Sequence, residues 1–212
     1  MFGLDDAIAS YSDGTSLLLV ALVAVLLGLR HATDPDHLAA VTTLVASSGE
    51  RAAVRLGLAW GAGHALSLFA FGLPILLFER YLPELVQHAA ETAVALLIVY
   101  LGVRLLVRSK RPVRPRRTTR AAFGIGLVHG MGGSAGVGVL IVASVESTPL
   151  EVVALALLAA FTAISMATVT SGFGHALVRR PAGIGAPVLG TLSLAFGAWY
   201  AGAAWSVFPY PF

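Results

Sequence analysis

The residues best suited to chemistry in this sequence lie within seven positions, directly after a long apolar segment. They are two histidines, two aspartates and a proline: His31, Asp34, Pro35, Asp36 and His37. Imidazole and carboxylate groups together suit borderline divalent ions such as Ni²⁺, Co²⁺, Zn²⁺ and Cu²⁺, whereas Mg²⁺ and Ca²⁺ prefer oxygen ligands. The same groups are also typical of a proton relay. Both interpretations are open at this point.

Pro35 decides whether these side chains can meet. On a straight helix, His31, Asp36 and His37 would point about 0°, 140° and 240° around the axis and could not share one ion. Proline has no N–H and clashes with the carbonyl four residues earlier, so we expect a kink or break that brings the side chains together and frees that carbonyl as a further ligand. Asp34 is open to three roles: a ligand, an acceptor that orients an imidazole, or a partner for the preceding arginine.

A simpler interpretation treats this motif as the cytoplasmic end of the first span. Arg30 would then reach the interface, and the aspartates would lie in water. However, an apolar pattern resumes at 38–46, which such an end does not explain. Ionisable groups inside a membrane are costly, so we interpret the cluster as a binding site.

The composition of the chain places these groups in a membrane. Of the 212 residues, 57% are hydrophobic and 12% are charged, and the mean hydropathy is +0.84. Soluble domains are about 25% charged, so we expect a multi-pass membrane protein. The chain has no cysteine, which excludes disulfides and thiolate metal sites. The net charge of +3 comes from arginine in the loops, so no nucleic-acid partner is expected.

Six apolar segments predict the membrane spans. A span needs about 20 apolar residues to cross about 30 Å of hydrocarbon, and lipid favours helices because it cannot satisfy open backbone groups. The segments are 16–46 (interrupted), 54–78, 91–107, 121–144, 150–178 and 184–208. We therefore predict an all-α membrane protein with about six transmembrane helices in a single domain, residues 1–212. The first helix is expected to be kinked or broken at Pro35.

The charges of the loops predict the orientation. Arginine and lysine gather in alternate loops, whereas the loops between them are acidic or mixed. The basic segments are 49–55, 108–120 and 179–180, and the others are 79–91 and 145–151. Basic loops face the cytoplasm. We therefore predict that 108–120 is a cytoplasmic loop and that both termini lie outside the cell (inner) membrane.

The two halves of the chain share short sequence echoes. Residues 28–31 read GLRH and residues 126–129 read GLVH, while 63–66 and 174–177 both read GHAL. Three spans in each half would give the halves opposite orientations, as in inverted-repeat transporters. A 3+3 inverted repeat is therefore predicted.

Three further polar residues within the spans are candidates. His64 lies near the middle of the second predicted span, where it is either a ligand or a buried hydrogen-bonded histidine. His129 and Ser134 lie in a glycine-rich stretch, 124–138, that can bend or unwind to line a cavity. We predict a supporting or pathway role for His129, Ser134 and Asp34. Plain close packing is the alternative.

The histidine–aspartate motif matches the H-x4-D-H signature of the nickel/cobalt transporter family. Its surroundings resemble the family pattern R-H-A-x-D-A-D-H-I-A-A, and the resemblance covers roughly residues 24–72. It implies that His31, Asp36 and His37 bind the metal ion. The family's glycine–histidine pair in the next span makes His64 the fourth ligand. The larger members have more spans than the six predicted here, so the chain is more similar to the shorter urease-accessory or nickel-export-type members.

These residues predict secondary transport of Ni²⁺ or Co²⁺ across the inner membrane, with no cofactor beyond the transported ion. Binding needs neutral histidines and an ionised aspartate, so affinity is expected to fall below about pH 6. The chain is not expected to be an enzyme, and an intramembrane zinc hydrolase with Asp34 as base is the weaker alternative. An accessory protein that delivers nickel to urease or hydrogenase assembly is another. The sequence does not choose between uptake and efflux, or between a monomer and a homo-oligomer.

Overall fold

The computed structural model describes six stretches of the chain, which contain seven helices and no strand. The stretches are 17–45, 50–78, 83–109, 118–132, 148–178 and 185–209. The helices are α2 (Leu17–His31), α3 (Pro35–Val45), α4 (Glu50–Phe78), α5 (Glu84–Ser109), α6 (Thr119–His129), α8 (Thr148–Val178) and α9 (Gly185–Ala203). The prediction of an all-α protein is confirmed over these stretches.

Three helices, α4, α5 and α8, are long and apolar enough to cross a membrane. The pair α2 and α3 forms a fourth candidate span, bent by 53° at its break. Helix α5 has 26 residues and is longer than the predicted span 91–107. The predicted span 121–144 is described only up to residue 132. The helices are typical of a membrane protein, and the count of six spans stays a prediction.

The predicted break in the first span is confirmed, and it lies directly before Pro35. Helix α2 ends at His31 and α3 begins at Pro35. Proline suits the first position of a helix, because the N–H that it lacks would have no partner within the helix there. The carbonyl of His31, which was expected to be free as a ligand, accepts a hydrogen bond from the Asp34 N–H at 3.2 Å.

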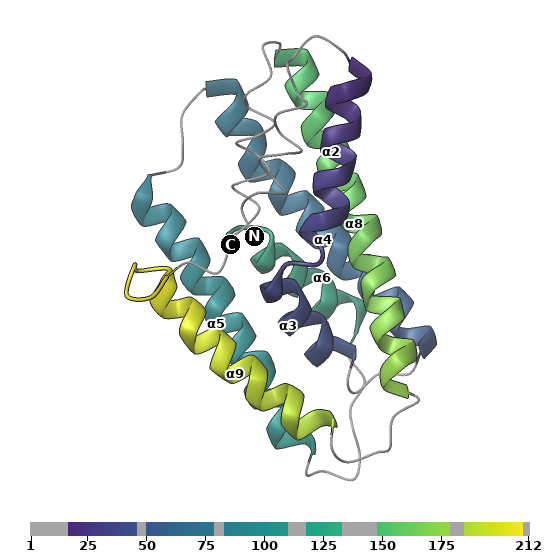
Figure 1. The fold of residues 1–212 in the computed structure, drawn as a ribbon, viewed down its shortest axis with the longest axis vertical. Helices are drawn as coiled ribbons and strands as arrows, with labels where there is room; N and C mark the ends of the chain where they lie inside the picture. Colours follow the sequence, from purple (N-terminus) through teal and green to yellow (C-terminus); the bar gives the residue numbers. More distant parts are fainter. Residues whose placement is uncertain are drawn as a thin grey trace.

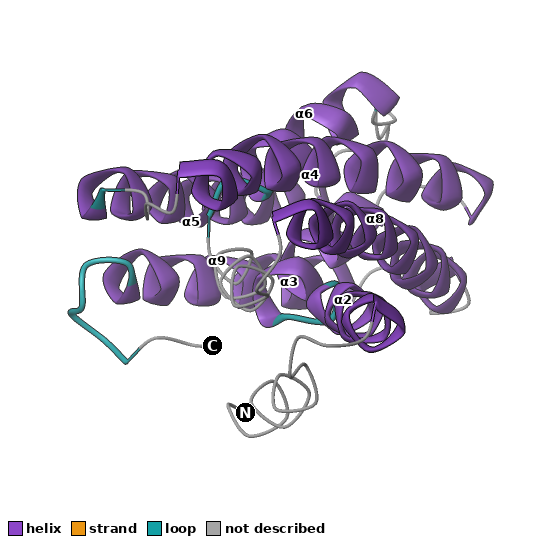
Figure 2. Cartoon of the chain, turned by 90° about the horizontal axis from the view of Figure 1, so that it is seen from above, coloured by secondary structure: helices purple, strands orange, loops and turns teal. Residues whose placement is uncertain are grey.

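The helices form one tightly joined group and one pair. Helix α4 packs against α8 and α6, and α2 packs along α8. Helix α5 packs against α9, as the view from above also shows (Figure 2). The short helix α3 lies between the pair and the group and contacts α9, α8, α5 and α4 (Figure 1). The residues after the break are therefore surrounded by helices from both halves of the chain.

Helix α2 approaches the backbone of α8 closely at Gly28. A Cβ atom at this position would lie 2.7 Å from the carbonyl oxygen of Leu158 and 2.9 Å from the nitrogen of Thr162. Real Cβ atoms do not come this close to backbone atoms. Only glycine allows α2 and α8 to pack at this distance.

Helix α6 approaches α4 in the same way at Gly126. A Cβ atom there would meet the carbonyl oxygen of Trp60 and would lie 2.9 Å from the nitrogen of His64. Each second-half residue in these two contacts lies 98 positions after its first-half counterpart: Gly28 and Gly126, Trp60 and Leu158, His64 and Thr162. Helix α2 therefore packs on α8 in the same register as α6 packs on α4.

Two serine hydrogen bonds follow the same register. The hydroxyl of Ser165 in α8 donates to the carbonyl of Leu29 at 2.8 Å, and the hydroxyl of Ser67 in α4 donates to the carbonyl of Leu127 at 2.7 Å. Both leucines lie in the last turn of their helices, where carbonyls have no N–H partner within the helix. A neighbouring helix thus satisfies the backbone at the point where α2 and α6 each end.

The outer surface of the bundle is apolar. Large aliphatic side chains that are more than half exposed occur on five different helices: Leu18, Leu58, Leu66, Leu96, Ile164 and Leu192. An apolar surface spread over several helices is unfavourable in water and suits contact with lipid chains. The polar residues described next lie on the opposite, inward faces.

Candidate metal centre

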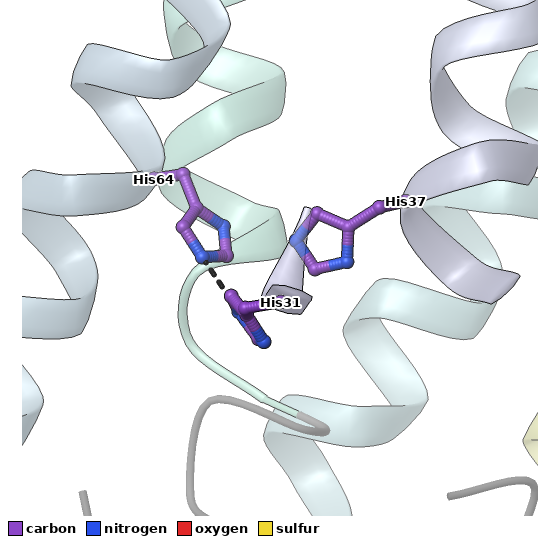
Figure 3. A group of neighbouring side chains, drawn as sticks. All are labelled: His31, His37 and His64. Atoms are coloured by element: carbon purple, nitrogen blue, oxygen red, sulfur yellow. Dashed lines mark hydrogen bonds between the residues drawn. The ribbon is translucent and has the colours of Figure 1, made fainter. Parts of the chain in front are cut away.

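Three histidines from three different helices converge inside the bundle (Figure 3). His31 ends α2, His37 is the third residue of α3, and His64 is the central residue of the 29-residue helix α4. All three are buried, and one ring nitrogen of each lies within 4.8 Å of those of the other two. The group lies level with the middle of α4.

The break between α2 and α3 allows His31 and His37 to face the same point. On a continuous helix the two side chains would point in directions about 120° apart. With the break, their ring centroids are 4.6 Å apart, in an edge-to-face arrangement. The ring of His64 lies 4.9 Å from that of His37 and 5.1 Å from that of His31.

Each of the first two histidines has a carboxylate behind it. An oxygen of Asp34 is 3.1 Å from Nδ1 of His31, and an oxygen of Asp36 is 3.0 Å from Nδ1 of His37. An ionised carboxylate can only accept, so both Nδ1 atoms carry the proton and donate it. The lone pair of each neutral ring is then on Nε2. This pairing is common in metal sites, because it fixes the tautomer and the orientation of the ligand.

Asp34 fills two of the three roles that the sequence left open. One carboxylate oxygen accepts from Nδ1 of His31, and the other accepts from Nη1 of Arg30 at 3.0 Å. It therefore orients an imidazole and pairs with the arginine. A carboxylate held by both partners is poorly placed to act as the general base that a zinc hydrolase would need.

Asp36 lies behind His37 and not among the three converging rings. Its Oδ1 accepts from Nδ1 of His37 and its Oδ2 accepts from Nε2 of His129, each at 3.0 Å. The sequence predicts Asp36 as a direct ligand together with His31 and His37. At the three-histidine group, this geometry favours an orienting role instead.

The three-histidine group has spacings that suit a divalent ion. Nitrogen ligands lie about 2.0–2.1 Å from such a metal, so two of them at angles of 90–109° are about 2.9–3.4 Å apart. The Nε2 atoms of His31 and His64 are 3.1 Å apart. A hydrogen bond between these two nitrogens needs a proton on one of them. An ion bound between them would instead use the lone pair of each nitrogen.

A buried ring nitrogen without a hydrogen-bond partner also indicates that an ion binds at the three-histidine group. Within the described stretches, Nε2 of His37 has no hydrogen-bond partner, although it is fully enclosed. Leaving a buried polar atom without a partner costs about 1–3 kcal/mol. In Figure 3 the ring of His37 faces the His31–His64 pair, where an ion would satisfy this atom.

His129 is more central than the sequence indicated. It ends α6, is fully buried, and has its ring centroid 4.6 Å from that of His37. The signal in the sequence is the echo between 28–31 and 126–129, which makes His129 the counterpart of His31. Ser134, the other residue predicted in this segment, lies outside the described residues.

Trp60 was not predicted as part of the site. Its ring centroid lies 5.8 Å from that of His37 and 5.9 Å from that of His129. It is 1% exposed, so its indole closes one side of the histidine cluster with apolar surface. The available signal is its position one helical turn before His64, which puts both on one face of α4.

The remaining two histidines do not belong to this cluster. The ring of His88, near the start of α5, packs against Trp205 at a centroid distance of 4.9 Å. His175 is exposed in the last turn of α8. The GHAL echo therefore does not place His175 in a position equivalent to that of His64 at the site.

Comparison with curated proteins finds similarity to the urease accessory protein UreH of Bacillus sp. (strain TB-90). The two chains are 28% identical, and the match covers 76% of this chain and 79% of that protein. No family model matches the chain, and no solved structure is significantly similar to it. The relative is named as an accessory protein and not as an enzyme, which agrees with the prediction that this chain is not an enzyme.

Proposed function

We propose that this protein is a membrane carrier for a divalent transition-metal ion, Ni²⁺ or Co²⁺. The ion binds to His31, His37 and His64, and Asp34 and Asp36 orient the first two rings. The observation that carries this proposal is the convergence of three buried imidazoles from three helices at the middle of α4. The ion is the substrate, and no other cofactor is needed.

The choice of metal follows from the donor set. Imidazole nitrogen suits nickel, cobalt, zinc and copper, and a group without carboxylate ligands is unsuited to Mg²⁺ or Ca²⁺. Nickel and cobalt are the ions implied by the resemblance of the motif to the nickel/cobalt transporter family. The similarity to a urease accessory protein is consistent with nickel.

Nearby charges reduce the cost of bringing a divalent cation into the membrane. Asp34 and Asp36 place two negative charges directly behind the ligands, and Arg30 compensates one of them. The cluster therefore carries a net negative charge before the ion enters. Without such charges, a buried divalent ion would be very unfavourable in a medium of low dielectric constant.

The proposal includes an inverted repeat of three spans plus three in a single domain, residues 1–212. The repeat is supported by the contacts of α2 on α8 and of α6 on α4, because equivalent residues in these two contacts are 98 positions apart in the sequence. Loop 108–120 then lies in the cytoplasm, and both termini lie outside the inner membrane. In this arrangement α2 and α6 enter the membrane from opposite sides, and both helices end at the same depth within it.

The matched contacts also bear on how access alternates. The close backbone contacts of α2 with α8 and of α6 with α4 join the two halves of the chain. We propose that α3 and the α5–α9 pair move against the group formed by α2, α4, α6 and α8. Because α3 carries His37, its movement would change the side to which the ion is open.

The test is uptake of ⁶³Ni²⁺ into proteoliposomes, comparing the wild type with His37→Ala and with His88→Ala as the matched control. We expect the His37 variant to lose at least tenfold in initial rate, the control to keep the wild-type rate, and excess Co²⁺ to inhibit. Equal uptake by His37→Ala and wild type would refute a carrier that uses this site.

A second candidate function is an accessory protein that delivers nickel to urease or hydrogenase assembly. The name of the similar Bacillus protein is the observation that favours it. The same proteoliposomes separate the two functions. Binding of Ni²⁺ that depends on His37, without any flux in correctly inserted protein, would identify the accessory role.

A further inference from the structure

We propose that the protein has a second position for the metal ion, formed by Asp36, His37 and His129. It lies next to the three-histidine position, and the two positions share His37. This inference rests on the proposed transport function and describes a step within it: the ion passes from one position to the other. One ligand atom from each of the three residues lies within 4.8 Å of the other two, and all three residues are buried.

The spacing of the donor atoms supports this second position. Asp36 Oδ2 and His129 Nε2 are 3.0 Å apart, as are Asp36 Oδ1 and His37 Nδ1. Oxygen and nitrogen ligands of a borderline ion lie about 2.0–2.2 Å from the metal, which puts neighbouring donors about 3 Å apart. One carboxylate and two imidazoles suit nickel, cobalt or zinc.

His37 lies midway between the two groups. Its ring centroid is 4.6 Å from that of His31 on one side and 4.6 Å from that of His129 on the other. The rings of His64 and His129 are further apart, at 6.2 Å. The two positions are therefore adjacent, and the move from one to the other replaces His31 and His64 by Asp36 and His129 while His37 is kept.

Movement of the ion to the second position requires the ring protons of His37 and His129 to change nitrogen. An ion at the second position needs the lone pairs of His37 Nδ1 and His129 Nε2, which carry protons while they donate to Asp36. Each ring stays neutral if its proton moves to its other nitrogen, His37 Nε2 or His129 Nδ1. Within the described stretches these two nitrogens are buried and have no hydrogen-bond partner, so once the ion has left the first position no other protein group occupies them.

This proton requirement limits the protein to one ion at a time. The first position uses the lone pair of His37 Nε2, and the second uses that of Nδ1. A neutral imidazole has only one nitrogen lone pair available, so His37 cannot serve both positions at once. The sharing of His37 therefore makes the two positions alternatives.

Binding of Co²⁺ to the purified full-length protein in lipid nanodiscs tests the second position, because the visible absorption of Co²⁺ depends on its ligands. His64→Gln removes a ligand from the first position only, and His129→Gln removes one from the second only. Glutamine at 129 can still donate to Asp36, which preserves the packing. His31→Gln is a second variant of the first position, and His88→Gln is the control.

We expect one Co²⁺ per chain in the wild type and in each single variant, with different spectra for His64→Gln and His129→Gln. The double variant His64→Gln/His129→Gln should bind at least 100-fold more weakly than either single variant. An affinity in the double variant equal to that of His64→Gln would overturn the second position. So would a loss of all binding in both His64→Gln and His31→Gln.

Nickel flux separates this inference from the proposed function. We expect His129→Gln to keep Co²⁺ affinity within about threefold of the wild type while ⁶³Ni²⁺ uptake falls at least tenfold. Wild-type uptake by His129→Gln would overturn the second position and leave the carrier function intact. A wild-type protein that neither binds nor transports either ion would instead refute the proposed function.

Discussion

The two helices that end inside the bundle, α2 and α6, are held alike but carry different chemistry. Each packs through a glycine against a backbone in the other half, and each has a terminal carbonyl that accepts from a serine of that neighbour. Each also ends in a buried histidine. However, His31 has its own carboxylate three residues later, whereas His129 donates to Asp36 in the other half of the chain.

The neighbours of these helices differ more strongly. At matched positions, α4 has His64 where α8 has Thr162, and Trp60 where α8 has Leu158. The backbone contacts are thus kept in both halves, while the imidazole of His64 and the indole of Trp60 occur only in α4. This difference suggests that the packing positions the site and that single side chains decide whether a position binds an ion.

The largest effect is expected from His64→Thr, which gives α4 the residue that α8 has. The ion would lose one of three nitrogen ligands, so Co²⁺ affinity should fall by more than about 100-fold, beyond the loss typical of an orienting residue. Titration followed by visible absorption measures it. The matched control is Thr162→Val: its hydroxyl is buried without a partner in the described stretches, so binding should be unchanged. Equal affinities for His64→Thr and wild type would remove His64 from the site.

A smaller effect is expected from the two carboxylates, and it should be unequal. Asp36→Asn disturbs hydrogen bonds to two rings, whereas Asp34→Asn disturbs one ring and Arg30. Because loss of an orienting partner costs about 10–100-fold in metal affinity, we expect the Asp36 variant near the upper limit and the Asp34 variant near the lower. Binding titrations of both variants at one pH make the comparison. The reverse order would mean that the Arg30 pair, and not the bond to His129, supports the site.

What could be predicted from the sequence depends on distance along the chain. The break at Pro35 follows from the local chemistry of proline, so it was predictable. The pairing of Asp36 with His129 was not, because the two residues lie 93 positions apart and His129 was predicted only in a supporting or pathway role. Trp60 was missed for the same reason, since a tryptophan in an apolar span carries no local signal of contact with His37.

The close contacts of Gly28 and Gly126 predict similar losses of stability on alanine substitution. A methyl group at either position must displace backbone, and such overpacking costs about 1–3 kcal/mol of unfolding free energy. Gly124→Ala is the control, because a Cβ there has nothing within 4 Å, so it should be neutral or slightly stabilising. Thermal unfolding in nanodiscs compares the three. If Gly126→Ala were as mild as Gly124→Ala, the close approach of α6 to α4 would not exist.

The smallest effects test the equivalence of the two helix ends most directly. Ser67→Ala and Ser165→Ala each remove one hydrogen bond to a helix-terminal carbonyl, so each should cost about 1 kcal/mol of unfolding free energy. Since the two bonds share no residue, their costs should add in the double variant within about 0.5 kcal/mol. Equal single costs would mean that the two ends are equivalent in energy as well as in geometry. A cost confined to Ser67→Ala would mean that only α6, which carries His129, needs this support, and the matched contacts would then be no evidence for a repeat.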